Sequence, residues 1–244
     1  MPLALLLALA LFLIAGCGGG SDPEAPAVRT SSAPASEQGG DLAVAALGDS
    51  ITAGSPLYDP DPEMRAALGF GDDQRSQFEY WATRADPSLA FENCGVFGER
   101  TDEIALRLEA CAEGADVLIV QGGINDIAQA LAGGPEAALD AAGEAAANID
   151  GMITQGKELG LDVVVVNVLP WNNGHPIADD PIDQLNSSIA AIAEREGVPL
   201  IDFYGALEDP DTSGVMAPEL TDDGDHPSIE GYKLLGALVA DEIS

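Results

Sequence analysis

The chain has 244 residues, 46% of them hydrophobic, so it can bury one sizeable core and is long enough for a single α/β domain. Its 42 acidic residues against 9 Lys and Arg give a formal net charge of −33, which opposes binding to nucleic acid or to an anionic membrane surface. The acidic residues are spread along the sequence, which is typical of a well-solvated surface. Adaptation to high salt is a hypothesis that also fits the presence of only two lysines, Lys157 and Lys233.

The first segment, residues 1–17, is a predicted export signal. An apolar run from Leu3 to Ala15 is too short to span a bilayer comfortably but suits the apolar region of a signal peptide. It ends in Ile14-Ala15-Gly16-Cys17, which resembles the lipobox of bacterial lipoproteins, although no Lys or Arg precedes the run. The resemblance implies that Cys17 is lipidated and anchors an exported protein at the cell envelope. A plain cleaved signal on a secreted protein and a buried N-terminal helix stay open as alternatives.

Residues 18–40 are a predicted flexible linker. They are rich in Gly, Ser, Pro and Ala and contain almost nothing apolar to bury. A folded domain, which we expect to be a monomer, then covers 41–244. If Cys17 carries a lipid, Cys94 and Cys111 are an even pair in an oxidising compartment. A disulfide between them is one interpretation, and two buried small apolar side chains is the other.

Five short apolar runs of this domain are predicted strands: 42–47, 89–94, 117–121, 163–168 and 199–203. Helical patterns separate and follow them at 73–84, 101–113, 135–159, 179–196 and 227–243. Strands that alternate with helices indicate a parallel sheet with helices on both faces, an α/β three-layer sandwich. In such sheets, active sites gather at the carboxyl ends of the strands.

The first predicted strand runs into Gly48-Asp49-Ser50, where Ser50 is either a nucleophile or the residue that starts a helix. A nucleophilic serine needs a base and a group that orients the base. The chain has 2 histidines. His226 follows Asp223 by three positions, close enough on one turn for the carboxylate to hold the imidazole, so we expect His226 to be the base. His175 is expected to be an exposed loop residue within reach of substrate.

The turns after the second and third strands supply candidate donors for an oxyanion. Gly98 in "NCGVFGERT" lets the backbone approach a reacting carbonyl, and Asn125 in "GGIND" can direct its side-chain amide into the same space. Each fragment alone has a simpler interpretation, because a Gly-rich turn is often only a turn and Asn125 or Asp126 can cap the next helix. No Gly-x-Gly-x-x-Gly turn follows the first strand, which argues against a dinucleotide-binding domain, and no Cys/His spacing predicts a metal site.

In this order, the fragments "GDSIT", "NCGVFGERT", "GGIND" and "DGDHP" resemble the signature blocks of the SGNH hydrolases, also called the GDSL esterase/lipase family, over about residues 42–242. The resemblance implies a flavodoxin-like fold with a five-stranded parallel sheet, and chemistry without a metal or other cofactor. It also implies a role for each matching residue: Ser50 as nucleophile and oxyanion donor, Gly98 and Asn125 as further oxyanion donors, His226 as general base and Asp223 as its orienting acid.

Some positions depart from the family pattern or compete with it. Ile51 stands where the family name has Leu, a change that we regard as harmless. Gly95 is an alternative to Gly98 as the oxyanion glycine. Asp222 and Asp225 crowd the position of the acid, but only Asp223 has the required spacing to the histidine.

The predicted function is hydrolysis of short-chain acyl or acetyl esters through an acyl-enzyme on Ser50. The alternatives are an O-acyltransferase, a lysophospholipase or a thioesterase with the same residues, and a binding module on a decayed hydrolase fold. The acidic composition favours small neutral esters or acetylated neutral sugars as substrates. Segments 52–73 and 170–181 are predicted site loops, in which the candidate apolar lining residues are Tyr58, Phe70 and Trp171.

Overall fold

A computed structural model describes residues 42–244, and the predicted signal, linker and Cys17 lie outside this range. Its five parallel strands form one sheet in the order β2-β1-β3-β4-β5. The strands are β1 (Leu42–Gly48), β2 (Leu89–Gly95), β3 (Val117–Val120), β4 (Asp162–Val166) and β5 (Leu200–Ile201). The predicted α/β sandwich with a five-stranded parallel sheet is confirmed.

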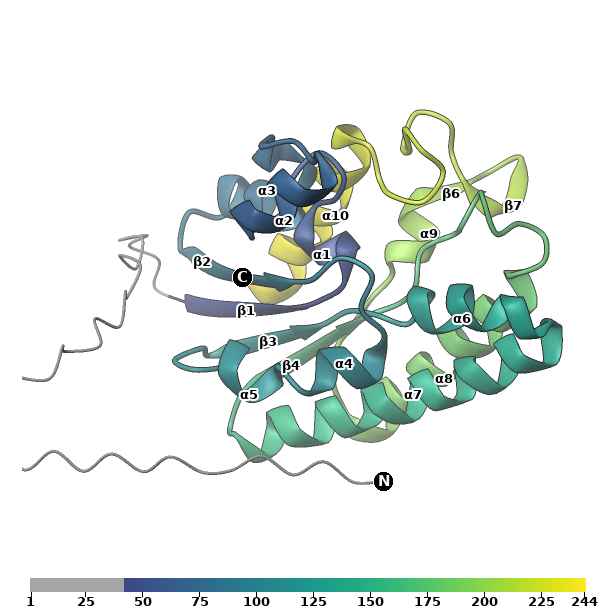
Figure 1. The fold of residues 1–244 in the computed structure, drawn as a ribbon. Helices are drawn as coiled ribbons and strands as arrows, with labels where there is room; N and C mark the ends of the chain where they lie inside the picture. Colours follow the sequence, from purple (N-terminus) through teal and green to yellow (C-terminus); the bar gives the residue numbers. More distant parts are fainter. Residues whose placement is uncertain (1–41) are drawn as a thin grey trace, which may run out of the picture. The chain divides into compact units, whose positions relative to one another are not determined.

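Both faces of the central strands β1, β3 and β4 are buried, which explains why these strands are almost continuously apolar. Along β1 the side chains alternate between the two sides: Ala45 and Leu47 belong to one core, and Val44 and Ala46 to the other. The first core is covered by α4 (Thr101–Ala105), α5 (Leu108–Cys111), α6 (Ile124–Ala130), α7 (Pro135–Glu158) and α8 (Asp179–Glu196). The second is covered by α1 (Ser50–Ala53), α3 (Phe78–Ala85), α9 (Phe203–Leu207) and α10 (Ile229–Ile243). Figure 1 shows these two layers of helices on either side of the sheet.

Two predicted helices are each interrupted. Segment 101–113 is divided into α4 and α5, because the N–H groups of Leu106 and Arg107 bond carbonyls three residues back instead of four. Segment 73–84 becomes a 3₁₀ turn, η1 (Gln74–Ser76), followed by α3. The apolar side chains Ile104, Leu108 and Cys111 of segment 101–113 are nevertheless buried together in the first core.

Several short elements were not expected from the sequence. Helix α2 (Pro62–Leu68) lies in segment 52–73, which was interpreted as a loop, and it buries none of its residues, so it has no apolar stripe to recognise. Helices α6 and α9, the 3₁₀ turn η2 (Leu131–Gly133) and the hairpin of β6 (Glu208–Asp209) and β7 (Thr212–Met216) were also missed. None of the helices within 42–244 has the length and apolarity needed to cross a membrane.

The strand order reverses at β1, which pairs with β2 on one side and with β3 on the other. In a sheet of this order, the carboxyl ends of β1 and β3 border the crevice at the topological switch point, where ligands bind. Ser50 follows β1 and Asn125 follows β3, so the fold brings both sequence-predicted residues to this crevice.

Candidate active site

The turn from β1 into α1 places Ser50 at the first position of a four-residue helix. Asp49 is the N-cap, and its carboxylate accepts the Ile51 N–H at 2.9 Å. The tight turn needs glycine at the preceding position, because a Cβ on Gly48 would overlap the side chains of Thr52 and Gln121. Ser50 is therefore both a helix-start residue and a candidate nucleophile, and the two interpretations of the sequence are compatible.

Helix α1 is too short to stabilise itself, so its unpaired carbonyls are held by side chains from elsewhere in the fold. Four such hydrogen bonds are present: Tyr232 Oη to Ile51 O at 3.1 Å, Asn93 Nδ2 to Thr52 O at 2.8 Å, Gln77 Nε2 to Ala53 O at 3.4 Å, and Ser76 Oγ to Gly54 O at 2.8 Å. Donors on α10, β2, η1 and the turn before α3 thus fix the helix that carries Ser50.

A continuous hydrogen-bonded chain links Ser50, His226 and Asp223. The Nε2 atom of His226 lies 3.0 Å from the Ser50 Oγ atom, and its Nδ1 atom lies 2.8 Å from Asp223 Oδ2. The other Asp223 oxygen accepts the backbone N–H of His226 at 2.8 Å and that of Asp225 at 2.9 Å. These bonds hold the imidazole with one nitrogen directed at the serine, which is the geometry that proton transfer from Ser50 requires.

The pKa values of the two acidic residues near Ser50 are shifted in opposite directions. Burial opposes ionisation of Asp223, but the hydrogen bonds from the His226 ring and from the backbone lower its pKa to about 2. Complete burial raises the pKa of Asp49 to about 6, against the lowering effect of the Ile51 N–H. Asp223, the carboxylate bonded to the histidine ring, therefore stays ionised to much lower pH than Asp49 does.

Three groups are candidate hydrogen-bond donors for an oxyanion. The Ser50 N–H is one of the first helical N–H groups, which have no acceptor inside a helix. Gly98 adopts a positive φ of 80°, a conformation that favours glycine, in the loop after β2. Asn125 donates one amide hydrogen to the Glu99 carbonyl at 2.9 Å and retains a second donor. Gly95, the alternative oxyanion glycine, instead ends β2 directly against the Ala53 backbone, where a Cβ would not fit.

The loop that carries Gly98 is braced by its neighbours. Arg107 forms an ion pair with Glu99 at 2.6 Å and donates to the carbonyls of Cys94 at 2.7 Å and Gly48 at 3.1 Å. Asp126 caps α4 through the Thr101 N–H at 3.0 Å, so it does not cap its own helix as the simpler interpretation proposed.

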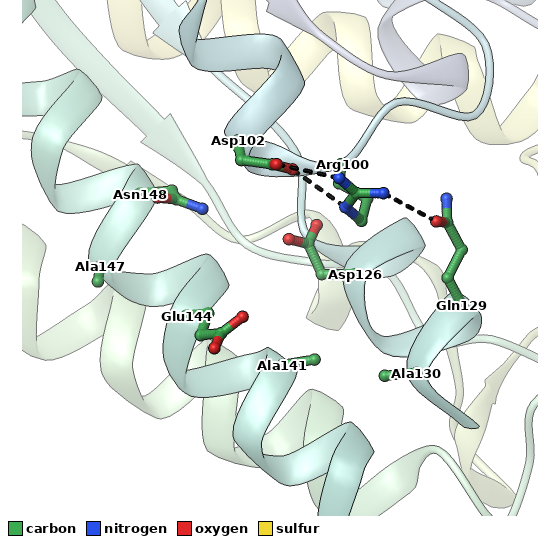
Figure 2. Close-up of a pocket in the computed structure, with 9 residues that line it drawn as sticks. All are labelled: Arg100, Asp102, Asp126, Gln129, Ala130, Ala141, Glu144, Ala147 and Asn148. Carbon is green, nitrogen blue, oxygen red and sulfur yellow. Dashed lines mark hydrogen bonds and ion pairs between the residues drawn. The ribbon is translucent and has the colours of Figure 1, made fainter. Parts of the chain in front are cut away.

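A hollow of about 580 Å³ adjoins this loop and lies between α4, α6 and α7 (Figure 2). The dashed lines in Figure 2 join Arg100 to Asp102 and to Gln129, and Gln129 in turn donates to the Gly98 carbonyl at 3.2 Å. The lining of this hollow contains none of Ser50, Asp223 and His226. We interpret it as the outer support of the Gly98 loop.

Cys94 and Cys111 are joined by a disulfide between the end of β2 and α5, with Cα atoms 6.0 Å apart. The disulfide reinforces the link between the end of β2 and the α4–α5 segment, which Arg107 also makes through its bond to the Cys94 carbonyl.

His175 is not part of the hydrogen-bonded set of Ser50, His226 and Asp223. Its Nδ1 atom is 2.9 Å from Asp179 Oδ2 at the start of α8, and no hydrogen bond joins it to Ser50. Within residues 42–244, no group of three or more His, Cys, Asp or Glu residues is arranged to hold a metal ion.

The candidate lining residues differ in their surroundings. Phe70 packs edge-on against Phe97, and Phe97 lies beside the His226 ring. Trp171 donates its Nε1–H to Asp225 at 2.5 Å and so contacts the turn that carries the histidine. Tyr58 lies under the Arg65 guanidinium at 5.1 Å and lines a separate hollow that contains neither Ser50 nor His226.

A serine, a histidine and an aspartate joined by hydrogen bonds at the carboxyl edge of a parallel sheet form the arrangement that serine hydrolases use. Residues 46–234 match the GDSL-like lipase/acylhydrolase family. The chain therefore belongs to this family and is an enzyme that hydrolyses esters. No significant match occurs among curated proteins.

Solved structures with the same fold are distant in sequence. A lipolytic protein of the G-D-S-L family from Desulfitobacterium hafniense is 20% identical, with a TM-score of 0.64 over 83% of this chain and 99% of its own. A GDSL-like lipase from Bacteroides thetaiotaomicron is 21% identical, with a TM-score of 0.59 over 82% and 87%. An acetylxylan esterase from Geobacillus stearothermophilus, solved as a catalytic mutant, is 21% identical, with a TM-score of 0.64 over 84% and 95%.

Proposed function

We propose that the chain is a serine esterase that removes short acyl groups, acetyl above all, through an acyl-enzyme on Ser50. The observation that carries this proposal is the chain of hydrogen bonds from Ser50 Oγ through His226 to Asp223. Complete burial of α1 and the fixed N–H groups around it give the site the preorganisation that acyl transfer needs.

In the first half of the reaction, Ser50 Oγ attacks the ester carbonyl carbon while His226 Nε2 accepts the serine proton. The carbonyl oxygen becomes an oxyanion, which the Ser50 N–H, the Gly98 N–H and the Asn125 amide stabilise. His226 then gives its proton to the alcohol oxygen as the carbon–oxygen bond of the ester breaks. The alcohol leaves, and the acyl group stays on Ser50.

In the second half, His226 removes a proton from a water molecule that attacks the acyl-enzyme. The second tetrahedral intermediate collapses, the proton returns to Ser50 Oγ, and the carboxylic acid leaves. Throughout both halves the ionised Asp223 stabilises the imidazolium form of His226. Transfer of the acyl group to an alcohol in place of water would follow the same steps, so the acyltransferase alternative is tested by the choice of acceptor.

Substitution of the nucleophile provides the direct test. We expect wild-type protein to hydrolyse p-nitrophenyl acetate and butyrate, and Ser50→Ala to lose this turnover by several orders of magnitude. A fluorophosphonate probe should label wild-type protein at Ser50 and should not label the variant. Equal turnover by both proteins would contradict the proposal. A second assay separates hydrolysis from acyl transfer. An acetylated sugar is supplied as acyl donor beside the p-nitrophenyl ester, and a free sugar competes with water as the acceptor.

Small neutral esters and acetylated neutral sugars are the proposed substrates, since the net charge of −33 disfavours anionic polymers. One of the fold neighbours is an acetylxylan esterase, which is in keeping with an acetylated neutral sugar. A series of p-nitrophenyl esters of increasing acyl length, run beside acetylated xylan, tests this assignment. Faster turnover of long-chain esters than of acetates would contradict it.

We further propose that the protein is exported and anchored by a lipid on Cys17. The Cys94–Cys111 disulfide supports an oxidising compartment. In a bacterial host, Cys17→Ser should move the protein from the membrane fraction to the soluble fraction, and it should prevent labelling by radioactive palmitate. Retention in the membrane fraction would contradict the anchor.

A further inference from the structure

The ring of Phe97 is one of the few large apolar side chains exposed within residues 42–244, and it lies beside the candidate active site. It is 39% exposed, whereas most large apolar side chains of this region are buried in the two cores. Its ring is 6.5 Å from the His226 ring, centroid to centroid, with 29° between the planes. Phe97 also directly precedes Gly98, so it is adjacent to both the base and the oxyanion loop.

The position of the Phe97 ring is supported from behind. Phe70 packs against it in an edge-on arrangement, with centroids 5.1 Å apart. The Phe70 segment is itself fixed, because Gly71 donates to the Pro56 carbonyl at 3.0 Å and Asp73 donates to the Leu57 carbonyl at 2.9 Å. An exposed aromatic ring that is held in this way is suited to bind an apolar surface of a ligand.

The chemistry of the proposed reaction determines which part of the ester this ring meets. His226 must deliver a proton to the alcohol oxygen when the ester bond breaks, so the alcohol part lies on the His226 side of the tetrahedral carbon. The oxyanion points instead toward Gly98 and Asn125. The Phe97 ring, which lies beside the imidazole, is therefore placed to meet the alcohol part.

Resting on the esterase function proposed above, we infer that Phe97 is a specificity-determining residue that binds the alcohol part of the substrate, and that this alcohol carries a ring next to the ester oxygen. An aryl ring or the apolar face of a pyranose stacks on phenylalanine, whereas a short linear alcohol has little surface to contribute. The enzyme is then selective for esters of ring alcohols, with modest demands on acyl length.

Two pairs of esters test the inference. Benzyl acetate and ethyl acetate share the acyl group and form the same acyl-enzyme, so they differ only in the alcohol. Ethyl acetate and ethyl butyrate share the alcohol. For Phe97→Ala we expect kcat/KM to fall about three- to tenfold for benzyl acetate and to change less than about twofold for both ethyl esters. Phe97→Trp should retain the preference for benzyl acetate, and Phe97→Leu should lose it.

A matched control is Leu159→Ala, which removes another exposed apolar side chain, 46% exposed, at the end of α7, and should leave all rates unchanged. Melting temperatures of the variants show whether they fold. An equal fall for all three esters, a fall that follows acyl length, or no fall would overturn the inference and leave the esterase function standing. Failure of wild-type protein to hydrolyse any of the esters, or equal hydrolysis by Ser50→Ala, would overturn the proposed function and the inference with it.

Discussion

Glu79 on α3 is a fully buried carboxyl group, and among the described residues neither of its side-chain oxygens has a hydrogen-bond partner. Burial raises its pKa well above the ordinary value of 4.5, because the charged form is not solvated. It lies on the helix that packs most closely on α10, whose Tyr232 holds the carbonyl of Ile51. The ionisation of Glu79 is therefore coupled to the stability of the layer that supports α1.

The raised pKa predicts that stability falls as pH rises. The folded chain holds the Glu79 proton above pH 4.5 while the unfolded chain releases it, so the stabilising contribution is complete below pH 4.5 and is lost as pH rises through the folded pKa. We expect the free energy of unfolding of wild type, measured in urea relative to Glu79→Gln, to decrease between pH 4.5 and neutral pH. Glu109→Gln, an exposed substitution on α5, is the control and should give no such trend. A difference between wild type and Glu79→Gln that does not vary with pH would contradict the prediction.

At the scale of single residues, the sequence identifies the groups with chemistry but not the groups that hold them. Ser50, His226 and Asp223 are predictable because few residue types can serve as nucleophile and base and the spacing of the last two is fixed. Gln121 and Asn93 were missed: the Gln121 side chain accepts the Asp49 N–H and the Asn93 amide donates to the Thr52 carbonyl, partners that only the fold brings together. Such long-range pairing leaves no local pattern in a single sequence.

At the scale of elements, segment 170–181 supports the turn 223–226, which carries the histidine and the aspartate. The Asn173 amide donates to the Asp223 carbonyl at 2.9 Å and to Asp225 Oδ1 at 2.7 Å, and Trp171 donates to the same Asp225 oxygen. Gly224 packs against the Asn173 side chain with a φ of 84°. The segment was predicted to be a site loop, and these contacts place it against the turn that carries the histidine.

We expect Asn173→Ala to loosen turn 223–226 and so to reduce the fraction of molecules with a correctly placed imidazole. The loss of these hydrogen bonds should lower kcat by roughly tenfold with little change in KM, since each is worth about 1 kcal/mol. The rate of fluorophosphonate labelling should fall in parallel because it uses the same base. Asn172→Ala is the matched control, because Asn172 bonds the backbone of Met216 in β7 and not the histidine turn. Equal losses of activity in both variants would indicate a general loosening of the segment and contradict the prediction.

The elements themselves differ in how well the sequence predicts them, and the reason is burial. Helices α7 and α8 were predicted to within one residue because each has a long apolar face. Strand β5 has only two residues where five were predicted, because pairing at a sheet edge ends before the apolar run does. Helix α2 and the β6–β7 hairpin bury little and carry no periodic signal.

At the scale of the whole molecule, the dominant feature is the excess of acidic over basic residues, 42 against 9. Within residues 42–244, most Lys and Arg side chains already form an ion pair, as Arg107 does with Glu99 and Lys157 with Glu196. Because acidic residues outnumber basic ones so strongly, most carboxylates have no Lys or Arg to pair with. Repulsion between carboxylates destabilises a compact chain more than an unfolded one, in which the charges move apart.

Screening of this repulsion by salt predicts that stability rises with ionic strength. The Debye length falls from about 30 Å at 0.01 M to about 3 Å at 1 M, so molar salt removes most repulsion between exposed carboxylates. We expect the melting temperature to rise between 0.01 M and 1 M KCl, and to rise as much in NaCl, because screening depends on ionic strength and not on the identity of the cation. Specific salt bridges of Arg and Lys are weakened over the same range, but the net charge of −33 makes their contribution the smaller one. Measurement at acidic pH offers an independent check. Protonation of surface carboxylates should reduce the difference in melting temperature between low and high salt. Unfolding that becomes easier as KCl increases would contradict both the screening argument and the hypothesis of adaptation to high salt.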